Sequence, residues 1–339
     1  MISCFNFRTQ KRKDEAEKER LFLKNGGLLL EALVASCDGK CNPIRSFSSE
    51  ELMKATNNYD PQRVIAEDSF FILYSGVLQD RPVSVKRYYE ESGFELSGLA
   101  INDIVIGSQM SAHNNALKLL GCCLETKYPT IVYEFMGDKT LSQFIDDTNG
   151  THGPLLSWKH RIKIAMGIAN GVAYLHNALS RPVIHRDIKP PFIVLDQEFN
   201  AKLFDFSLSI AIPDGQSYVN DVVVGTSSFL AKEYLCSGNA TEKVDVYSFG
   251  VVLIQLLTRR KAYEFVHIYE QGLEIGELIE TVDASILDEG IELQDLLPFA
   301  TLARSCVCDE AEDRPTMIHV AKELKQIYQS VPVVSSPTS

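Results

Sequence analysis

The chain has 339 residues, 45% of which are hydrophobic, so it is long enough for one large two-lobed domain or two smaller ones with a substantial core. Its formal net charge is −12, with the acidic residues concentrated between Lys261 and Asp313, which argues against nucleic-acid binding by the body of the protein. No apolar run approaches the ~20 residues that span a bilayer, and the eight cysteines lack the paired spacing of a zinc site.

Residues 1–45 are predicted to form a helical extension ahead of the main fold. The mixed-charge stretch Lys11–Arg20 favours a solvent-exposed helix, and the mildly basic start of the chain allows at most peripheral contact with an anionic membrane. Cys4 is a candidate for palmitoylation. The apolar stretch Leu21–Val34 follows, and Asn25-Gly26-Gly27 is expected to break it into two short helical pieces. Because this stretch is too apolar for a free tail, we expect it to pack on the body of the protein.

Several short strands and two helices are predicted next. The first helix begins near Phe47, with Ser48 as its N-cap and Glu51 at capping-box spacing. Hydrophobic alternation and turn residues then predict two strands around a turn, a third strand, a helix and two more strands. In chain order these elements cover Val64–Leu78, Val83–Lys86, Leu96–Met110, Leu119–Cys123 and Ile131–Phe135.

The stretch Ile184–Ser207 carries two polar clusters separated by a predicted hairpin, and it follows an amphipathic helix expected over Trp158–His176. The first cluster reads HRDIK and the second reads FDFS. Between them lie a short apolar run, a polar turn and a second apolar run. This arrangement resembles the protein-kinase pattern H-R-D-L-x-x-x-N, a hairpin, then D-F-G.

The resemblance implies an α+β, bilobal protein-kinase fold with a small β-rich lobe and a large, mostly helical lobe. Residues 46–136 would form the small lobe, residues 137–331 the large lobe, and residues 332–339 a disordered tail. The resemblance also implies that Tyr133 is the gatekeeper and that the stretch from Glu134 to Met136 faces the adenine of ATP.

The predicted nucleotide-binding residues depart from the kinase pattern at the Gly-rich loop. The three glycines that cover the ATP phosphates would fall at Ala66, Asp68 and Phe71. The Phe71 ring would crowd the site, and an Asp68 carboxylate ~5 Å from a phosphate would repel it by about 3 kcal/mol at an effective dielectric of ~20. Lys86 matches the strand lysine that contacts the phosphates. Asp103 stands for its Glu partner and is one methylene shorter, so we expect the pair to be long or absent.

The catalytic and metal-binding positions are only partly retained. Asp187 stands where the kinase base accepts the proton of the substrate hydroxyl, and Lys189 follows it. Asp205 stands at the position of the main Mg²⁺ ligand, whereas Phe192 replaces the Asn that holds a second Mg²⁺ and offers no ligating oxygen. Ser207 replaces the glycine after Phe206 and is expected to restrict the backbone there. The sequence therefore predicts that binding of ATP and Mg²⁺ is weak or absent.

The activation segment of the kinase pattern corresponds to the stretch from Ser207 to Glu233. Its hydroxyls are candidates for docking or modification, with simple solvation as the alternative. Asp245 and Arg314 match fold-holding residues of the family, and Arg314 is expected to pair with the acid at the end of the segment. The candidate residues of the segment are Ser207, Ser217, Tyr218, Thr226 and Glu233.

Four further stretches are similar to one plant subgroup of the receptor-like cytoplasmic kinase family, the ZRK-type (HopZ-ETI-deficient-related) pseudokinases. They read NGGLLLEAL, ATNNYD, SQMSAHNNALKLLGCCLE and DRPTMIHVAKELKQI. The resemblance implies an adaptor that binds a coiled-coil NLR immune receptor and senses receptor-like cytoplasmic kinases modified by bacterial effectors. It also implies a cytoplasmic protein that associates with the plasma membrane through its partners.

Three functions remain open at this point. Phe192 and the three missing loop glycines favour a pseudokinase adaptor in plant innate immunity. The retained Lys86, Asp187 and Asp205 favour a weakly active Ser/Thr protein kinase that transfers the ATP γ-phosphate to protein hydroxyls. A scaffold that binds ATP without phosphotransfer is the third. Nucleotide binding separates the first from the third, and Asp187-dependent phosphate transfer separates the second from both.

Overall fold

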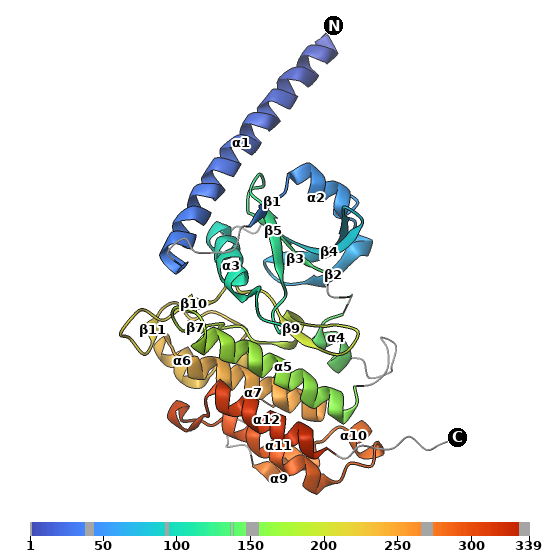
Figure 1. Cartoon of the computed structure of the whole chain (residues 1–339), viewed down its shortest axis with the longest axis vertical. Helices are drawn as coiled ribbons and strands as arrows, with labels where there is room; N and C mark the ends of the chain where they lie inside the picture. Colours follow the sequence, from blue (N-terminus) through green and yellow to red (C-terminus); the bar gives the residue numbers. More distant parts are fainter. Residues whose placement is uncertain are drawn as a thin grey trace, which may run out of the picture. The chain divides into compact units, whose positions relative to one another are not determined.

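The computed structural model describes residues 2–37, 44–91, 95–135, 137, 139–146, 156–265 and 274–331, with side chains from Gln10 onward except that of Cys37. The chain divides into two compact units. The predicted α+β class is confirmed, because one unit is rich in strands and the other is mostly helical (Figure 1). We call them the small unit, Met1–Ala112, Ala116–Lys139 and Asp205–Ser207, and the large unit, His113–Asn115, Thr140–Phe204 and Leu208–Ser339.

The small unit is built on a six-stranded sheet with the strand order β1-β5-β6-β4-β3-β2. Strand β1 runs parallel to β5, and all other neighbours are antiparallel. The predicted strands are all present, whereas the two-residue strand β1 was not predicted. The strands are β1 (Arg45–Ser46), β2 (Val64–Glu67), β3 (Phe71–Leu78), β4 (Arg81–Tyr88), β5 (Leu119–Cys123) and β6 (Thr130–Glu134).

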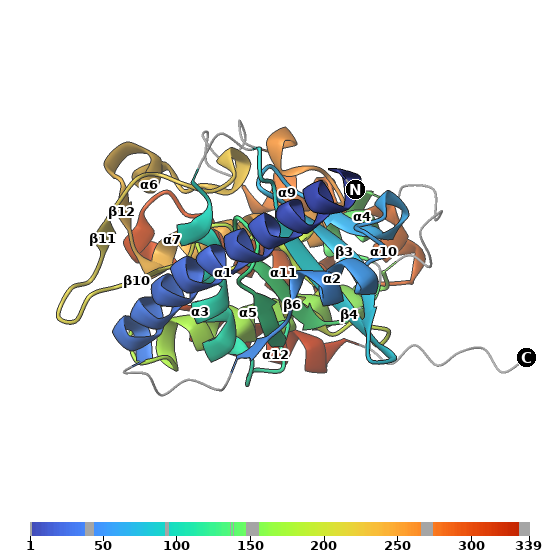
Figure 2. The same ribbon diagram turned by 90° about the horizontal axis from the view of Figure 1, so that it is seen from above.

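The helix at the start of the chain, α1 (Ile2–Cys37), is continuous, so the predicted break at Asn25-Gly26-Gly27 is wrong. The Asn25 side chain is fully buried, and its amide donates to the carbonyl oxygens of Leu124 and Thr126 at 2.9 and 3.0 Å. A residue that ordinarily favours turns therefore anchors the helix to a loop of the sheet. The predicted packing of this stretch on the body is confirmed, since α1 lies beside α3 (Ser97–Met110) in both views (Figure 1, Figure 2).

The helix α2 (Ser49–Ala55) begins as predicted. The Ser48 hydroxyl accepts the Glu51 N–H while the Glu51 carboxylate accepts the Ser48 N–H, so the capping box is complete. The end of α2 contacts β3 at Gly76, where an added Cβ would lie 3.2 Å from the Ala55 carbonyl oxygen. The glycine at position 76 therefore permits this close approach. A short 3₁₀ turn, η1 (Pro61–Arg63), leads from the helix toward β2.

The large unit is a group of packed helices with short hairpins. The helix α5 packs on α12 and α7, and α7 packs on α11 (Figure 1). The predicted hairpin after the first polar cluster is present as β8 and β9. The helices and 3₁₀ turns are α4 (Leu141–Asp146), α5 (Trp158–Asn177), η2 (Pro190–Phe192), η3 (Ser227–Phe229), α6 (Lys232–Ser237), α7 (Glu242–Thr258), η4 (Ala262–Glu264), α9 (Ile275–Glu280), α10 (Ala284–Asp288), α11 (Leu293–Cys306), η5 (Ala311–Asp313) and α12 (Met317–Ser330).

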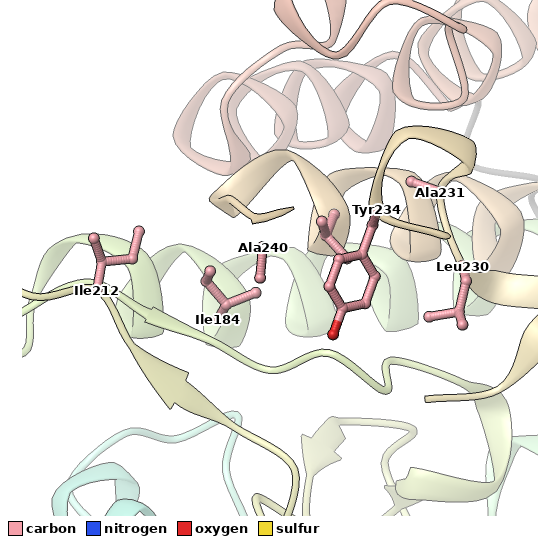
Figure 3. Packing of buried hydrophobic residues seen from close by; sticks show 7 residues of the cluster. Ile184, Ile212, Leu230, Ala231, Tyr234 and Ala240 are labelled. Carbon is pink, nitrogen blue, oxygen red and sulfur yellow. The ribbon is translucent and has the colours of Figure 1, made fainter. Parts of the chain in front are cut away.

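The segment that follows the second polar cluster is anchored to the large unit by two strand pairs and one apolar cluster. β10 pairs with β7, and β11 pairs with β12, in each case antiparallel. The cluster in Figure 3 joins both ends of the segment to the neighbouring helices through Ile184, Ile212, Leu230, Ala231, Tyr234, Ala240 and Val244. The strands are β7 (Val183–Ile184), β8 (Ile193–Leu195), β9 (Ala201–Leu203), β10 (Ile210–Ala211), β11 (Val219–Asn220) and β12 (Asn239–Ala240).

Within the described ranges, none of the helices is both long and apolar enough to cross a membrane. The predicted boundary between the lobes falls after residue 136, and the chain passes from the small to the large unit slightly later, after Lys139. Met136 and the predicted tail, 332–339, lie outside the described residues.

Candidate functional site

Lys86 on β4 is the centre of a buried charge cluster in the small unit. Its Nζ lies 2.6 Å from Oδ2 of Asp103 and 2.5 Å from Oδ1 of Asp205. The side chains of Lys86 and Asp103 are completely buried, and that of Asp205 is 4% exposed. Burial alone lowers the pKa of Lys86, but the two carboxylates raise it above its ordinary value, so the amine is protonated. The expectation that the Lys86–Asp103 pair is long or absent is therefore wrong.

The short Asp103 side chain reaches Lys86 because further bonds hold its surroundings. Its Oδ1 accepts the N–H of Phe206 at 2.9 Å, and its Oδ2 also accepts the Tyr88 hydroxyl at 3.3 Å. The carboxylate thus ties α3, β4 and the chain around Phe206 together.

Aromatic rings cover the remaining side of the Lys86 amine. The Phe71 ring centroid lies 3.9 Å from Nζ, and the Tyr88 ring centroid lies 4.9 Å from it. The two rings are 6.1 Å apart in an edge-to-face arrangement. Phe71 is 2% exposed and Tyr133 is fully buried. Burial, followed by the charges of Asp103 and Asp205, raises the pKa of Tyr88 and of Tyr133 well above the ordinary value, so both hydroxyls stay neutral.

The other predicted nucleotide-binding positions lie away from this cluster or serve the sheet. Ala66 is half-buried on β2. The Asp68 carboxylate accepts the Ser69 N–H at 2.7 Å, and the Asp68 N–H donates to the Phe71 carbonyl at 3.0 Å, so the loop between β2 and β3 closes on itself. The Glu134 carboxylate accepts the N–H of Lys118 at 3.3 Å at the end of β6.

Asn102 was not predicted as a site residue, and it fixes the start of the segment after Asp205. Its side-chain amide donates to the carbonyl oxygens of Phe206 and Ser207 at 3.1 and 3.0 Å. The Ser207 N–H also donates to Asp205 Oδ1 at 3.3 Å. The backbone of Asp205 has a positive φ of 65°, a conformation that local bonds must hold in place. The chain around Asp205 is therefore locked to α3 within the small unit.

In the large unit, Asp187, Lys189 and Thr226 form a second polar cluster. Lys189 Nζ lies 3.0 Å from Asp187 Oδ2 and donates to Thr226 Oγ1 at 2.9 Å. The Thr226 hydroxyl donates to Asp187 Oδ1 at 2.7 Å, in the manner expected of a substrate hydroxyl approaching a base. Asp187 is 5% exposed. The predicted base position thus has partners on both carboxylate oxygens.

Phe192 lies in an apolar setting beside this cluster. Its ring is 3% exposed and meets the Phe204 ring edge to face at a centroid distance of 5.7 Å. The Lys189 Nζ lies 4.0 Å from the Phe192 ring centroid. The position thus presents a ring face to a cation rather than an oxygen to a metal. In the part of the chain with described side chains, no group of three or more His, Cys, Asp or Glu is placed to hold a metal ion.

Two buried ionic residues, Asp245 and Arg314, bond to several segments of the large unit, and the predicted pairing of Arg314 with Glu233 is confirmed. The Asp245 carboxylate accepts the N–H groups of His185 and Arg186 at 2.8 and 2.9 Å, and lies 2.8 Å from Nε2 of His176. Burial raises the pKa of Asp245. The hydrogen bond and charge of His176, together with the charge and backbone hydrogen bond of His185, lower it by more, so the pKa lies below its ordinary value. Arg314 makes a two-pronged ion pair with Glu233, at 2.7 and 2.9 Å.

The candidate hydroxyls of the activation segment differ in setting. Ser217 and Tyr218 are exposed, whereas Thr226 is engaged by Asp187 and Lys189. An ion pair between Arg186 and Asp221, at 2.8 Å, was not predicted. The sequence did contain a signal for this ion pair. Arg186 directly precedes Asp187, and Asp221 is the one acidic residue between position 220 and Glu233.

Comparisons with known proteins agree with this architecture. Residues 73–327 match the family described as the protein kinase domain. Among Arabidopsis thaliana proteins, non-functional pseudokinase ZED1 is 42% identical over 332 residues, which are 93% of this chain and 98% of that protein. Serine/threonine-protein kinase ZRK1 is 40% identical, over 95% of this chain and 96% of its own length. Non-functional pseudokinase ZRK2 is 37% identical, over 94% and 93%. Similar proteins thus include some named as pseudokinases and some named as kinases.

Proposed function

Because the chain belongs to the protein kinase family, and within it to the plant ZRK group of receptor-like cytoplasmic kinases, we propose that it is a catalytically silent adaptor in plant innate immunity. In this proposal it binds a coiled-coil NLR immune receptor and senses receptor-like cytoplasmic kinases that bacterial effectors have modified. The name of ZED1, a non-functional pseudokinase, and the sequence resemblance described above support this assignment.

The observation that carries the proposal is the sealed Lys86. The Lys86 amine is fully buried between Asp103 and Asp205 and lies under the Phe71 ring. Residue 71 corresponds to a position where kinases have a glycine. For a nucleotide phosphate to contact the Lys86 amine, the Phe71 ring must leave its place 3.9 Å from Nζ and give up its buried packing. The loss of that packing opposes nucleotide binding.

At two places in the chain, Phe192 and the β2–β3 loop, the residues present do not fit a nucleotide with bound metal. Phe192 offers no ligating oxygen, and its ring packs on Phe204 and Lys189. The β2–β3 loop has a carboxylate and a buried ring in place of two phosphate-cradling glycines. We infer that ATP and Mg²⁺ bind weakly or not at all, and that the fold is used as a binding body.

A weakly active Ser/Thr kinase is the second candidate. Lys86, Asp187 and Asp205 are retained, and the cluster of Asp187, Lys189 and Thr226 is fully formed. The relative named serine/threonine-protein kinase ZRK1 supports this candidate. The third candidate, an ATP-binding scaffold without phosphotransfer, needs nucleotide to displace Phe71 from Lys86.

The adaptor proposal is tested by separating binding from chemistry with one substitution. The full chain and its Asp187→Asn variant are each co-purified with a coiled-coil NLR receptor, and ATP binding is measured by calorimetry with and without Mg²⁺. The adaptor predicts equal receptor binding by both proteins and no ATP binding at millimolar nucleotide. Phosphate transfer from ATP that disappears in a folded Asp187→Asn variant would favour the enzyme, and submillimolar ATP binding without transfer would favour the scaffold.

A further inference from the structure

One side of α1 packs on the rest of the small unit through residues spaced three or four positions apart. Asn25 is fully buried and Leu29 is 8% exposed, while Leu21 and Ala32 are half-buried. Because an α-helix has 3.6 residues per turn, this spacing puts all four residues on one side of α1. The helix therefore uses one side for the small unit, and the opposite side points away from it.

The opposite side of α1 carries a second apolar stripe, which is exposed. Its large side chains are those of Leu23, Leu30 and Val34, which are 67%, 64% and 54% exposed. Gly27 continues the stripe, and an added Cβ there would lie more than 4 Å from every heavy atom of the described residues. The steps along the stripe are four, three and four residues, which is the spacing of the apolar contact line in coiled coils. We call these four residues the α1 seam.

A second copy of α1 fits the seam best when the two helices run antiparallel. A parallel copy would place Gly27 against Gly27, which leaves a gap, and Arg20 against Arg20, which repel each other. An antiparallel copy centred midway between Gly27 and Leu30 places each of these leucines over the glycine of the other copy. The same register places Leu23 against Val34. Large side chains then fill the space beside both glycines, and two-fold symmetry makes each contact twice.

The charges beside the seam favour the same arrangement. Lys24 and Glu31 are exposed, and each directly follows a leucine of the seam. In an antiparallel pair these flanking positions face each other, so Lys24 of each copy would lie near Glu31 of the other. In a parallel pair Lys24 would lie near Glu19 instead. Glu31 would then lie beside Gly26, which offers no charge.

We propose that two copies of this chain associate through the α1 seam as an antiparallel pair of helices. Large apolar patches on soluble proteins commonly mark interaction sites, because covering them removes apolar surface from water. The pairing covers the three large side chains of each seam, and the flanking charges set its direction. It uses the side of α1 that points away from the small unit, and it does not depend on the adaptor function.

Sedimentation velocity of the full chain at a series of concentrations measures the association. We expect a reversible dimer with a dissociation constant of roughly 1–100 µM, because the seam is short. Leu30→Glu puts a charge into the seam and should weaken dimerisation at least tenfold. The matched control is Leu28→Glu, which makes the same change on another side of α1 and should alter the constant by less than about threefold. The unfolding midpoint of each variant shows that it is folded.

Charge reversal tests the direction of the two helices. Lys24→Glu and Glu31→Lys should each weaken the dimer by about threefold or more at low salt, because each puts like charges opposite one another. The double variant Lys24→Glu/Glu31→Lys restores opposite charges and should return the constant to within about twofold. A double variant as weak as Lys24→Glu alone would contradict the antiparallel pairing.

Three other results would overturn the proposed dimer. A chain that remains monomeric at about 200 µM would show that the seam does not bind a second copy. A dimer that persists in Leu30→Glu would use another surface. Capture of a coiled-coil receptor by a monomeric chain, lost in Leu30→Glu and kept in Leu28→Glu, would assign the seam to the receptor.

Discussion

Phe71 shows how a single side chain changes the surroundings of a retained lysine. The charged residues of the kinase pattern, Lys86 and Asp205, are present and in contact, yet the position that would be a glycine carries a ring packed on the lysine amine. The ring supplies apolar contact and a cation–π interaction at a place where kinases keep open space for phosphate. The sequence identified the substitution as crowding, whereas the direct contact with Lys86 depends on the positions of β3 and β4.

Phe71→Ala should expose Lys86 and weaken the small unit. Deleting a buried phenyl ring costs about 3–5 kcal/mol through lost burial and the cavity that remains. We expect a lower unfolding midpoint and several-fold faster acylation of Lys86 by an amine-reactive ester, with the modified lysine located by mass spectrometry. Phe70→Ala is the matched control, because it deletes the same side chain at the adjacent, half-buried position. Unchanged Lys86 reactivity in a folded Phe71→Ala variant would show that the ring is not the cover.

At the scale of elements, the sequence predicted those helices and hairpins whose formation depends on residues only a few positions apart. The capping box of α2 and the β8–β9 hairpin were found because capping and turn residues act within a few positions. The continuity of α1 was missed because Asn25 bonds to carbonyls about a hundred residues away. The Lys86–Asp103 contact was missed for the same reason, since bonds from Phe206 and Tyr88 hold the carboxylate in place. Contacts of this kind leave no periodic pattern in the sequence.

Gly121→Ala should detach the strand β1 from the sheet. Arg45 of β1 pairs with Gly121 of β5, and an added Cβ would lie 2.1 Å from the Arg45 carbonyl oxygen and 2.7 Å from the Phe47 ring. Either the strand or the ring must move. We expect the Phe47 N–H, which donates to the Cys122 carbonyl, to lose at least tenfold of its protection from hydrogen exchange.

Gly27→Ala is the matched control for this glycine substitution. An added Cβ at position 27 meets no heavy atom within 4 Å, and replacing a glycine within a helix by alanine stabilises the helix by about 1 kcal/mol. We therefore expect the protection of α1 to rise while that of β1 is unchanged. Retained protection of Phe47 in Gly121→Ala would contradict the tight parallel pairing of β1 with β5.

At the scale of the whole molecule, buried ion pairs rather than surface charges shape the response to acid. Besides Asp245, the large unit buries Arg161, which lies 2.5 Å from Asp283 and also donates to the carbonyls of Leu156 and Leu256. Burial raises the pKa of Asp283, but the hydrogen bond and charge of Arg161 lower it, with a net lowering. A carboxylate whose pKa is lower in the folded chain stabilises the fold above its ordinary pKa, and this stabilisation is lost as the pH falls through the folded-state value.

Asp283→Asn should therefore destabilise the chain in a pH-dependent way. At pH 7 the variant loses a charge-assisted bond to Arg161, and we expect the free energy of unfolding to fall by about 2 kcal/mol. As the pH falls below about 4, Asp283 becomes protonated first in the unfolded chain and, at a still lower pH, in the folded chain, so the difference between the two proteins should shrink. Denaturant unfolding at a series of pH values measures this. The control is Asp288→Asn, which removes an exposed carboxylate at the end of α10, the helix that Asp283 caps. Its effect on the free energy of unfolding should not change with pH in this way. A constant difference between pH 7 and pH 3 would exclude Asp283 as its source.

The measurement that tests the central claim most directly is phosphate transfer. The full chain is incubated with labelled ATP and with Mg²⁺ or Mn²⁺, beside Asp187→Asn, and label on the chain itself and on a general protein substrate is counted. The sealed Lys86 and the ring at Phe192 predict incorporation no higher than that of the variant. Incorporation that disappears in Asp187→Asn would contradict a silent adaptor and would make Lys86, Asp187 and Asp205 the working residues of a kinase.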